Sequence, residues 1–309
     1  MDRIVFLGTS AGAPTRTRNV TSHCVLTRAG RVWMLDCGEG TQHRVLACDA
    51  VKPTRIDVIL ITHTHGDHLL GLPGLLSSLS LGGNRAKPVR VFGPVGVKRF
   101  LETAIEVTDA FLTYKLEITE LTPGEARELG IIDGIKLSAH PLVHRVPCFG
   151  YVLEETVNEP RIDPAKAASI GVTGKLIGQL ARGDPVTLAD GTVVTFDQAE
   201  NAMCSCTSGA MSPEMAVGRG HSTSTMTGAF AKAIEAKKLI LTHFSSRYSD
   251  GKAGQADSEP AAFAATRETT SAAGSAEVTD IAGLVAEAQA ACPDTEVVAA
   301  SDFAIFTID

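Results

Sequence analysis

The chain has 309 residues with a formal net charge of −7, and 44% of its residues are hydrophobic while 20% are charged. That apolar fraction is ample for a buried core, and the acidic excess argues against indiscriminate nucleic-acid binding, although a local basic patch can still hold phosphates. No apolar run approaches the ~18 residues of a membrane span and no leader-like segment precedes the first strand, so we expect a folded, soluble protein with no membrane partner.

The first 38 residues are predicted to form a strand, a loop and a hairpin. The strands are expected at residues 3–8, 24–27 and 32–38. Arg16 and Arg18 lie in the loop, where they could bind phosphate or merely keep the loop solvated. Asp36 ends the hairpin, and it could orient a neighbouring ligand or cap the next helix. The isolated His23 and His43 are interpreted as structural residues.

Residues 56–70, IDVILITHTHGDHLL, are the most informative stretch of the chain. The apolar run is typical of a buried strand, which delivers polar residues at its carboxyl end. His63 and His65 are two apart, so an extended segment points both imidazoles the same way, while Asp67 and His68 follow a glycine at a turn. Four candidate metal ligands can therefore face one cavity; the alternative is that they are satisfied surface side chains.

Strands and helices then alternate along the chain. Helices are expected at 71–81 and 95–112, and strands at 88–94 and 116–121. The amino end of the first helix lies at the histidine cluster, where its backbone N–H groups would favour a phosphate. His140 and His144 follow between two strand-like runs, and either could reach the cluster.

From about residue 155 to 190 the pattern changes to small helical pieces. Three positive residues without an acid between them, Lys166, Lys175 and Arg182, suit an arm that contacts a polyanion, although an ordinary surface helix pair has the same pattern. Residues 196–220 show no strand periodicity. Cys204 and Cys206 lack a second cysteine pair, so we interpret them as free thiols. The seven scattered cysteines of the chain indicate a reducing, cytoplasmic compartment.

The last third of the chain contains a second apolar run that ends in a histidine. His221 precedes a helix expected at 221–236, with Ser222 or Thr223 as its N-cap. The apolar run that follows ends in His243, as the earlier strand ends in His63. Residues 249–279 have too few apolar side chains to order themselves. A helix at 282–292 and a strand pair at 296–308 follow, and no internal repeat divides residues 1–309 into more than one expected domain.

Several of these stretches together resemble the short form of ribonuclease Z, the tRNA 3′ processing endonuclease of the metallo-β-lactamase superfamily. They are FLGTSAGAPTRTRN, VWMLDCGEGTQHRVL, LITHTHGDHLLGLPGLL, PLVHRVPCFGYVL, RGHST and LILTHFSSRY. The resemblance implies an α/β fold, an αββα sandwich, with two zinc ions and commonly a homodimer. It implies hydrolysis of precursor tRNA that removes the 3′ trailer and leaves a 3′-hydroxyl. The H-x-H-x-D-H element alone would indicate only the superfamily.

The resemblance also assigns roles by position. His63, His65 and His144 resemble the ligands of one zinc, and Asp67, His68 and His243 resemble those of the other. Asp67 further resembles the general base, and His221 resembles a residue that assists the leaving oxygen. His140 has no counterpart in the family pattern, which is why His144 is preferred. The donor chemistry agrees, since imidazole suits zinc better than magnesium, and two metals can brace an in-line attack on a phosphodiester.

Three departures from the family stand out, of which the insert at 249–279 is expected to be harmless because a surface loop costs little more as it lengthens. The segment at about 155–187 resembles the family's tRNA-gripping exosite, but Gly174-Lys175 replaces the usual Gly-Pro. The family also has two strands and a helix before R-G-H-S, about 25 to 30 residues that the gap from Glu200 to His221 cannot supply. That segment carries an aspartate that bridges both zincs, and Asp197 and Glu200 are weak substitutes. One zinc or none is therefore conceivable, as is a silent RNA-binding or dimer-partner subunit, or another phosphodiesterase of the superfamily.

Overall fold

The structure is a computed structural model, and it describes residues 1–81, 85, 87–156, 216, 218, 220–248 and 280–308, with the backbone of 186–187, 193–194 and 202–205. Contacts between Cα atoms divide the chain into two compact units. The first unit comprises Met1–Arg127, Ala139–Tyr151 and Asn201–Asp309, and the second comprises Glu128–Ser138 and Val152–Glu200. No helix among the described residues is long and apolar enough to cross a membrane.

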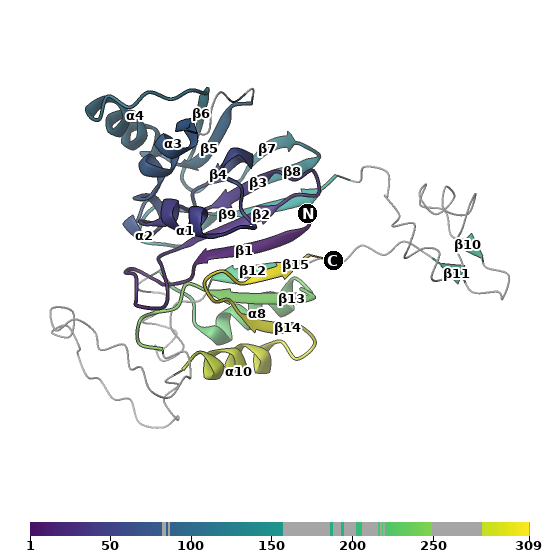
Figure 1. The fold of residues 1–309 in the computed structure, drawn as a ribbon. Coiled ribbons are helices and arrows are strands. Elements are labelled where there is room, and N and C mark those ends of the chain that lie inside the picture. The colour runs from purple at the N-terminus through teal and green to yellow at the C-terminus, as the bar shows by residue number, and fades with distance from the viewer. Residues whose placement is uncertain are drawn as a thin grey trace. The chain divides into compact units, whose positions relative to one another are not determined.

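A seven-stranded sheet forms the centre of the first unit, with the order β15-β1-β2-β3-β4-β5-β6 (Figure 1). The strands are β1 (Arg3–Gly8), β2 (Ser22–Leu26), β3 (Val32–Leu35), β4 (Ile56–Leu60), β5 (Val89–Pro94), β6 (Leu116–Leu121) and β15 (Ile305–Thr307). The predicted amino-terminal hairpin is confirmed, because β1, β2 and β3 pair antiparallel, and β3 to β6 pair parallel. Every residue of β4 is buried, as its unbroken apolar run predicts.

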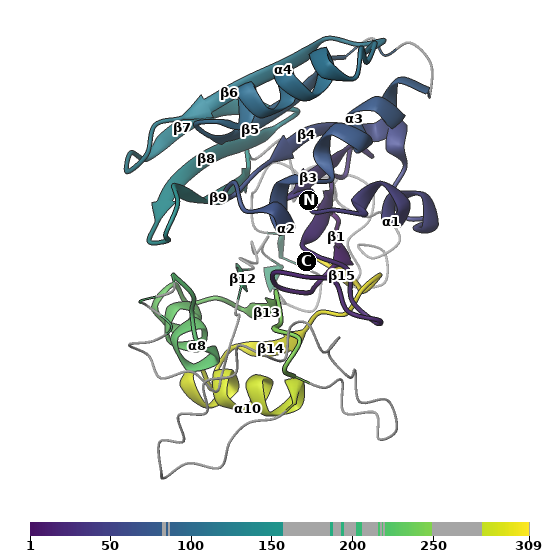
Figure 2. The ribbon, with the colours of Figure 1, turned by 90° about the vertical axis from the view of Figure 1, so that its left-hand side faces the viewer.

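Helices cover one face of this sheet (Figure 2). They are α1 (Thr41–Ala47), α3 (Leu72–Leu81) and α4 (Val97–Val107), with the short α2 (Gly66–Leu69) and the 3₁₀ turn η1 (Pro53–Arg55) between them. Their apolar sides join the sheet in one hydrophobic core, in which Leu75 and Leu101 from the helices meet Ile59 and Val91 from the strands. This packing fixes the carboxyl end of β4, from which the histidine-rich segment leaves.

A smaller parallel sheet with the order β12-β13-β14 completes the first unit. It consists of β12 (Ala202–Ser205), β13 (Lys238–Thr242) and β14 (Glu296–Ala299), and helices α8 (Ser224–Ala233) and α10 (Ile281–Ala291) pack on one face of it. The prediction that 196–220 holds no strand is wrong, since β12 lies in register with β13 and pairs Ser205 with Thr242. Four residues of a parallel strand are too few to show an alternating pattern. The closing strand pair is also corrected, because β14 joins β13 while β15 joins β1.

A third sheet has the order β7-β8-β9. Its strands are β7 (Arg127–Ile132), β8 (Ile135–Leu142) and β9 (Cys148–Glu155), of which β7 was not anticipated. In the second unit, Lys136 forms ion pairs with Glu128 and Glu154, which cross-link the three strands. The antiparallel pair β10 (Val186–Thr187) and β11 (Val193–Val194) also belongs to this unit. Most of the predicted arm at 155–187 and the whole insert at 249–279 lie outside the described residues.

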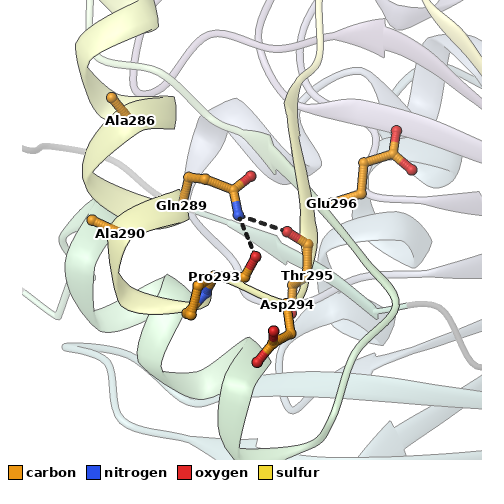
Figure 3. Close-up of a pocket in the computed structure, with 7 residues that line it drawn as sticks. All are labelled: Ala286, Gln289, Ala290, Pro293, Asp294, Thr295 and Glu296. Carbon is orange, nitrogen blue, oxygen red and sulfur yellow. Dashed lines mark hydrogen bonds between the residues drawn. The ribbon is translucent and has the colours of Figure 1, made fainter.

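The carboxyl end of α10 is closed by a glutamine side chain (Figure 3). The Gln289 amide nitrogen donates to the carbonyl oxygens of Cys292 at 3.0 Å and Thr295 at 2.8 Å. The bond to Cys292 satisfies a carbonyl at the end of the helix. The bond to Thr295 holds the turn that leads into β14. The shallow hollow beside this turn contains none of the predicted site residues.

Candidate metal centre

Four chain segments bring the predicted ligands together within the first unit. His63 and His65 follow β4, and Asp67 and His68 lie on α2, which begins directly after His65. His144 lies in the connection between β8 and β9. His243 follows β13, as the likeness of its strand to β4 predicts. The side chains thus meet because separate strands end at one edge of the unit.

The six residues form two groups of three. His63, His65 and His144 make the first triad, in which the Nε2 atom of His144 lies 3.2 Å from the Nδ1 atom of His65. Asp67, His68 and His243 make the second triad. There the Asp67 Oδ2 atom lies 3.3 Å from His68 Nε2 and 3.2 Å from His243 Nε2, and the two Nε2 atoms are 3.1 Å apart. The rings of His63 and His68 lie 4.0 Å apart between centroids and link the two triads.

These spacings fit a shared cation as well as they fit the hydrogen bonds of a protonated His68. Ligands at about 2.0–2.1 Å from a tetrahedral zinc ion lie roughly 3.3 Å from one another. The measured separations of 3.1–3.3 Å in the second triad match that value. Two imidazole Nε2 atoms facing each other can share a hydrogen bond only if one carries a proton, whereas a cation satisfies both lone pairs. The second triad therefore fits a metal ion on geometric and chemical grounds, and the 3.2 Å between His144 Nε2 and His65 Nδ1 in the first triad agrees with the same spacing.

Asp36 contacts His68 on the side of the ring that faces away from the triad. Of the two roles considered for Asp36, it therefore orients a neighbouring candidate ligand and does not cap a helix. Its Oδ2 atom lies 2.7 Å from His68 Nδ1, so the Nε2 atom of that ring faces the triad. The same carboxylate accepts hydrogen bonds from the Thr62 backbone and hydroxyl, both at 2.8 Å. Thr62 Oγ1 in turn lies 3.0 Å from His63 Nδ1. One buried carboxylate thus supports a ligand of each triad, as carboxylates behind metal-binding histidines commonly do.

A backbone carbonyl performs the same task for His144. Its Nδ1 atom donates to the carbonyl oxygen of Gly220 at 2.7 Å, which leaves Nε2 free to face the first triad. Gly220 has a φ of +72°, and a Cβ atom built there would lie 2.4 Å from His144 Nδ1. Only glycine therefore fits at this position. Sequence reasoning missed this contact, although the glycine directly precedes the singled-out His221.

Two of the site residues adopt strained backbone conformations. Asp36 has a φ of 56° and His243 a φ of 65°, in the left-handed region that non-glycine residues seldom occupy. Such conformations persist only where the surrounding structure enforces them, and they concentrate at functional sites. Asp36 is enforced in part by its backbone N–H, which donates to the Leu60 carbonyl oxygen at 2.9 Å.

Burial and mutual charge set the protonation of the triads. Burial, followed by the neighbouring His68, lowers the pKa of His63 to about 3. Burial alone would lower the pKa of His68 as well, but the Asp36 and Asp67 carboxylates outweigh it and raise that pKa to about 9. Burial likewise opposes the ionised form of Asp67, yet hydrogen bonds from His243 and His68 hold its pKa far below the usual range. A cation entering the second triad near pH 7 therefore has to displace a proton from His68.

His221 lies beside the first triad, with its ring centroid 5.8 Å from that of His144. Its position ahead of α8 is as predicted, and Thr223 rather than Ser222 caps that helix by accepting a hydrogen bond from the Met226 N–H. The family resemblance makes His221 a residue that assists the leaving oxygen, and this role requires a proton on its ring. Burial, followed by His243 and His144, lowers its pKa to about 4. The side chain is therefore neutral at pH 7 until a negative charge approaches it.

The other singled-out residues divide into three sets. Arg16 is exposed on the loop, whereas the Arg18 guanidinium is occupied by Thr9 Oγ1 at 2.6 Å and the Ala300 carbonyl oxygen at 2.9 Å. The interpretation of Arg18 as a phosphate ligand is thus weakened by its intramolecular partners. Three further histidines belong to neither triad, and the arm residues and carboxylate substitutes lie outside the described part. The three histidines are His23, His43 and His140. The residues outside the described part are Lys166, Lys175 and Arg182 of the arm, and the carboxylates Asp197 and Glu200.

Comparison with known proteins places these features in context. A family model described as a β-lactamase superfamily domain matches residues 31–244. Ribonuclease BN of Cronobacter sakazakii is 39% identical over 278 residues, which cover 80% of this chain and 90% of that protein. Ribonuclease Z of Acaryochloris marina is 36% identical over 285 residues, covering 81% and 88%. The crystal structure of human tRNase Z, short form, covers 99% of both chains with 26% identity and a TM-score of 0.66.

Proposed function

Because the chain belongs to the metallo-β-lactamase superfamily, and within it to the ribonuclease Z and ribonuclease BN family, we propose that it is a metal-dependent endoribonuclease that removes the 3′ trailer from precursor tRNA. Cleavage by this enzyme leaves a 3′-hydroxyl on the tRNA. The mixed α/β metallo-β-lactamase fold expected from the sequence is confirmed. The single observation that carries the proposal is the linked pair of donor triads in the first unit.

Zinc is the metal that this donor set favours, with one ion for each triad. Five of the six donors are imidazoles and the sixth is a carboxylate. Imidazole-rich sites prefer zinc to the oxygen-seeking magnesium and calcium ions. When bound, zinc supplies Lewis acidity and activates water near neutral pH. The oriented Nε2 atoms of His68 and His144 are the groups best prepared to hold it.

The reaction assigns separate tasks to side chains at the cluster. Asp67 is ionised at physiological pH. Its low pKa makes it a weak base, so it would accept a proton from the attacking water only where a bound metal has made that water more acidic. His221 would give a proton to the leaving oxygen, and its position beside the first triad supports this role. A bound phosphodiester would raise the low pKa of His221 by its negative charge, and protonation of that ring would then coincide with substrate binding.

Substrate contacts are proposed for residues outside the two triads. Arg16, which is exposed, would contact the RNA backbone near the cut. Lys166, Lys175 and Arg182 would hold the body of the tRNA through its phosphates, because positive side chains without intervening acids are the simplest match for a polyanion.

Exchange of residues 157–185 for a short Gly-Ser linker tests this division. We expect kcat/KM for precursor tRNA to fall by about 100-fold, because several phosphate contacts are lost together. Hydrolysis of bis(p-nitrophenyl) phosphate should stay within about twofold, since the triads are untouched. A triple change of Lys166, Lys175 and Arg182 to glutamine serves as the matched control for charge. Equal loss of both activities in a folded variant would contradict the proposal.

A homodimer is proposed as the functional form. Large apolar side chains are exposed on α1, at the end of α3 and after α4, including Leu46, Leu81 and Phe111. Exposed apolar residues gathered on helices commonly mark interfaces. The mass measured by light scattering during gel filtration should equal two chains.

The free, mostly buried cysteines of the described part support a reducing, cytoplasmic compartment.

A catalytically silent RNA-binding or dimer-partner subunit is the alternative. It is favoured by the donor set, because among the described residues Asp67 is the only carboxylate in either triad. The alignment with the Cronobacter protein spans 278 positions but only 80% of 309 residues, so the relative has residues facing gaps in this chain. The alternative predicts RNA binding without cleavage and fewer than two zinc ions per chain.

A further inference from the structure

Residues 9–20, here called the N-terminal loop, run beside the second triad. The Thr9 carbonyl oxygen accepts from the Phe244 N–H at 2.8 Å, and the Ala11 N–H donates to the Phe244 carbonyl oxygen at 2.9 Å. Phe244 directly follows the ligand candidate His243. The next amide, that of Gly12, donates to Asp67 Oδ2 at 2.7 Å. The N-terminal loop thus contacts the same carboxylate oxygen that faces the two histidines of the second triad.

A single carboxylate near the carboxyl end of the chain holds both ends of this loop. Asp302 Oδ1 accepts from the Thr9 hydroxyl at 2.7 Å, and its Oδ2 atom accepts from the Asn19 N–H at 2.7 Å. Oδ2 also accepts from the Arg44 guanidinium of α1, again at 2.7 Å. The Asp302 side chain is only 5% exposed. Three donors from two parts of the chain therefore converge on one buried acid, about 290 residues away from the loop in sequence.

Two arginines surround this carboxylate and complete the assembly. Arg18 donates to Thr9 Oγ1 and to the Ala300 carbonyl oxygen, and its guanidinium lies 5.0 Å from the centre of the Phe244 ring. Arg44 lies 3.8 Å from the centre of the Phe303 ring. Charge-assisted hydrogen bonds and cation–π contacts of this kind are geometrically demanding. They fix the N-terminal loop to a rigid part of the unit.

We propose that Asp302 is a positioning residue for Asp67: it clamps the N-terminal loop so that the Gly12 N–H holds Asp67 Oδ2 toward the second triad. The inference deepens the proposed function and rests on it for the catalytic role of Asp67. It also assigns Arg18 to the clamp rather than to substrate. Removal of a group behind a metal ligand typically weakens metal affinity by about 10- to 100-fold.

Asp302→Asn tests the proposal, because it keeps the shape of the side chain and removes the charge that pairs with Arg44. Three results are expected in the zinc-loaded protein. Amide hydrogen exchange of a peptide covering residues 9–20 becomes faster, and the zinc affinity of one of two sites falls about tenfold in competition with a chromophoric chelator. For precursor tRNA, kcat falls about tenfold while KM stays within about twofold. Asp294→Asn, an exposed aspartate in the turn before β14, is the matched control and should match wild type.

The outcomes separate the clamp from other roles. One outcome would be a lowered melting temperature while hydrogen exchange in the loop and zinc affinity stay unchanged. It would show that Asp302 only stabilises the folded protein, and it would overturn the proposal. A raised KM with unchanged kcat would assign the loop to substrate binding and overturn it equally. Asp302→Glu should restore part of the zinc affinity. If wild type does not cleave precursor tRNA, the proposed function fails, whereas exchange and zinc titration still decide whether Asp302 positions Asp67.

Discussion

Replacement of Asp67 by alanine is expected to reduce kcat for precursor tRNA by about 10³-fold or more, with tRNA affinity changed by less than about threefold. The carboxylate is proposed to be both a metal ligand and the proton acceptor, so its loss would remove two contributions at once. It accepts hydrogen bonds from Gly12, and it lies within 3.3 Å of His68 and His243. Single-turnover cleavage and filter binding of the same precursor measure the two quantities.

The interpretation depends on the separation of chemistry from binding. Asp49→Ala removes an exposed aspartate from the end of the α1 region and serves as the control for loss of negative charge. If Asp67→Ala weakened tRNA binding as much as it slowed cleavage, the metal centre rather than the arm would hold the substrate. Retained cleavage in Asp67→Ala would remove Asp67 from the reaction altogether.

Local sequence pattern made four of the six candidate donors predictable. His63, His65, Asp67 and His68 lie within six residues after an apolar strand, so their convergence needs no information about the remaining fold. His243 was found for a similar reason, because its strand has the same apolar character. His144 required the family resemblance, since His140 stands at an equally plausible local position.

Contacts between distant segments could not be read from the sequence. The alternatives for Asp36 were decided by His68, which lies 32 residues away. Arg18 looked like a phosphate ligand because its partners, Thr9, Phe244 and Ala300, come together only in the folded chain. Strand β12 escaped prediction since four residues of a parallel strand carry no alternation. The low pKa of His221 likewise depends on burial, which the sequence does not state.

Replacement of His144 by alanine is expected to remove one zinc ion per chain and to abolish cleavage. Its Nε2 atom faces His65 Nδ1 at 3.2 Å, and the first triad would be left with two protein donors, too few for a stable zinc site. His140→Ala is the matched control, because His140 is exposed four residues earlier and belongs to neither triad. Elemental analysis after gel filtration, with catalytic rates on the same samples, measures both effects. Equal zinc content in the two variants would exclude His144 as a ligand.

Gly220→Ala should likewise remove one zinc ion per chain and abolish cleavage, although it replaces none of the candidate ligands. The added methyl group would lie within 2.4 Å of His144 Nδ1 and would strain a backbone with a φ of +72°, so the imidazole has to move away from the triad. Gly218→Ala is the control, because a Cβ atom there meets nothing within 4 Å. If the wild-type chain holds only one zinc, Gly220→Ala distinguishes which triad holds it. Loss of the ion assigns it to His63, His65 and His144, and retention assigns it to the second triad.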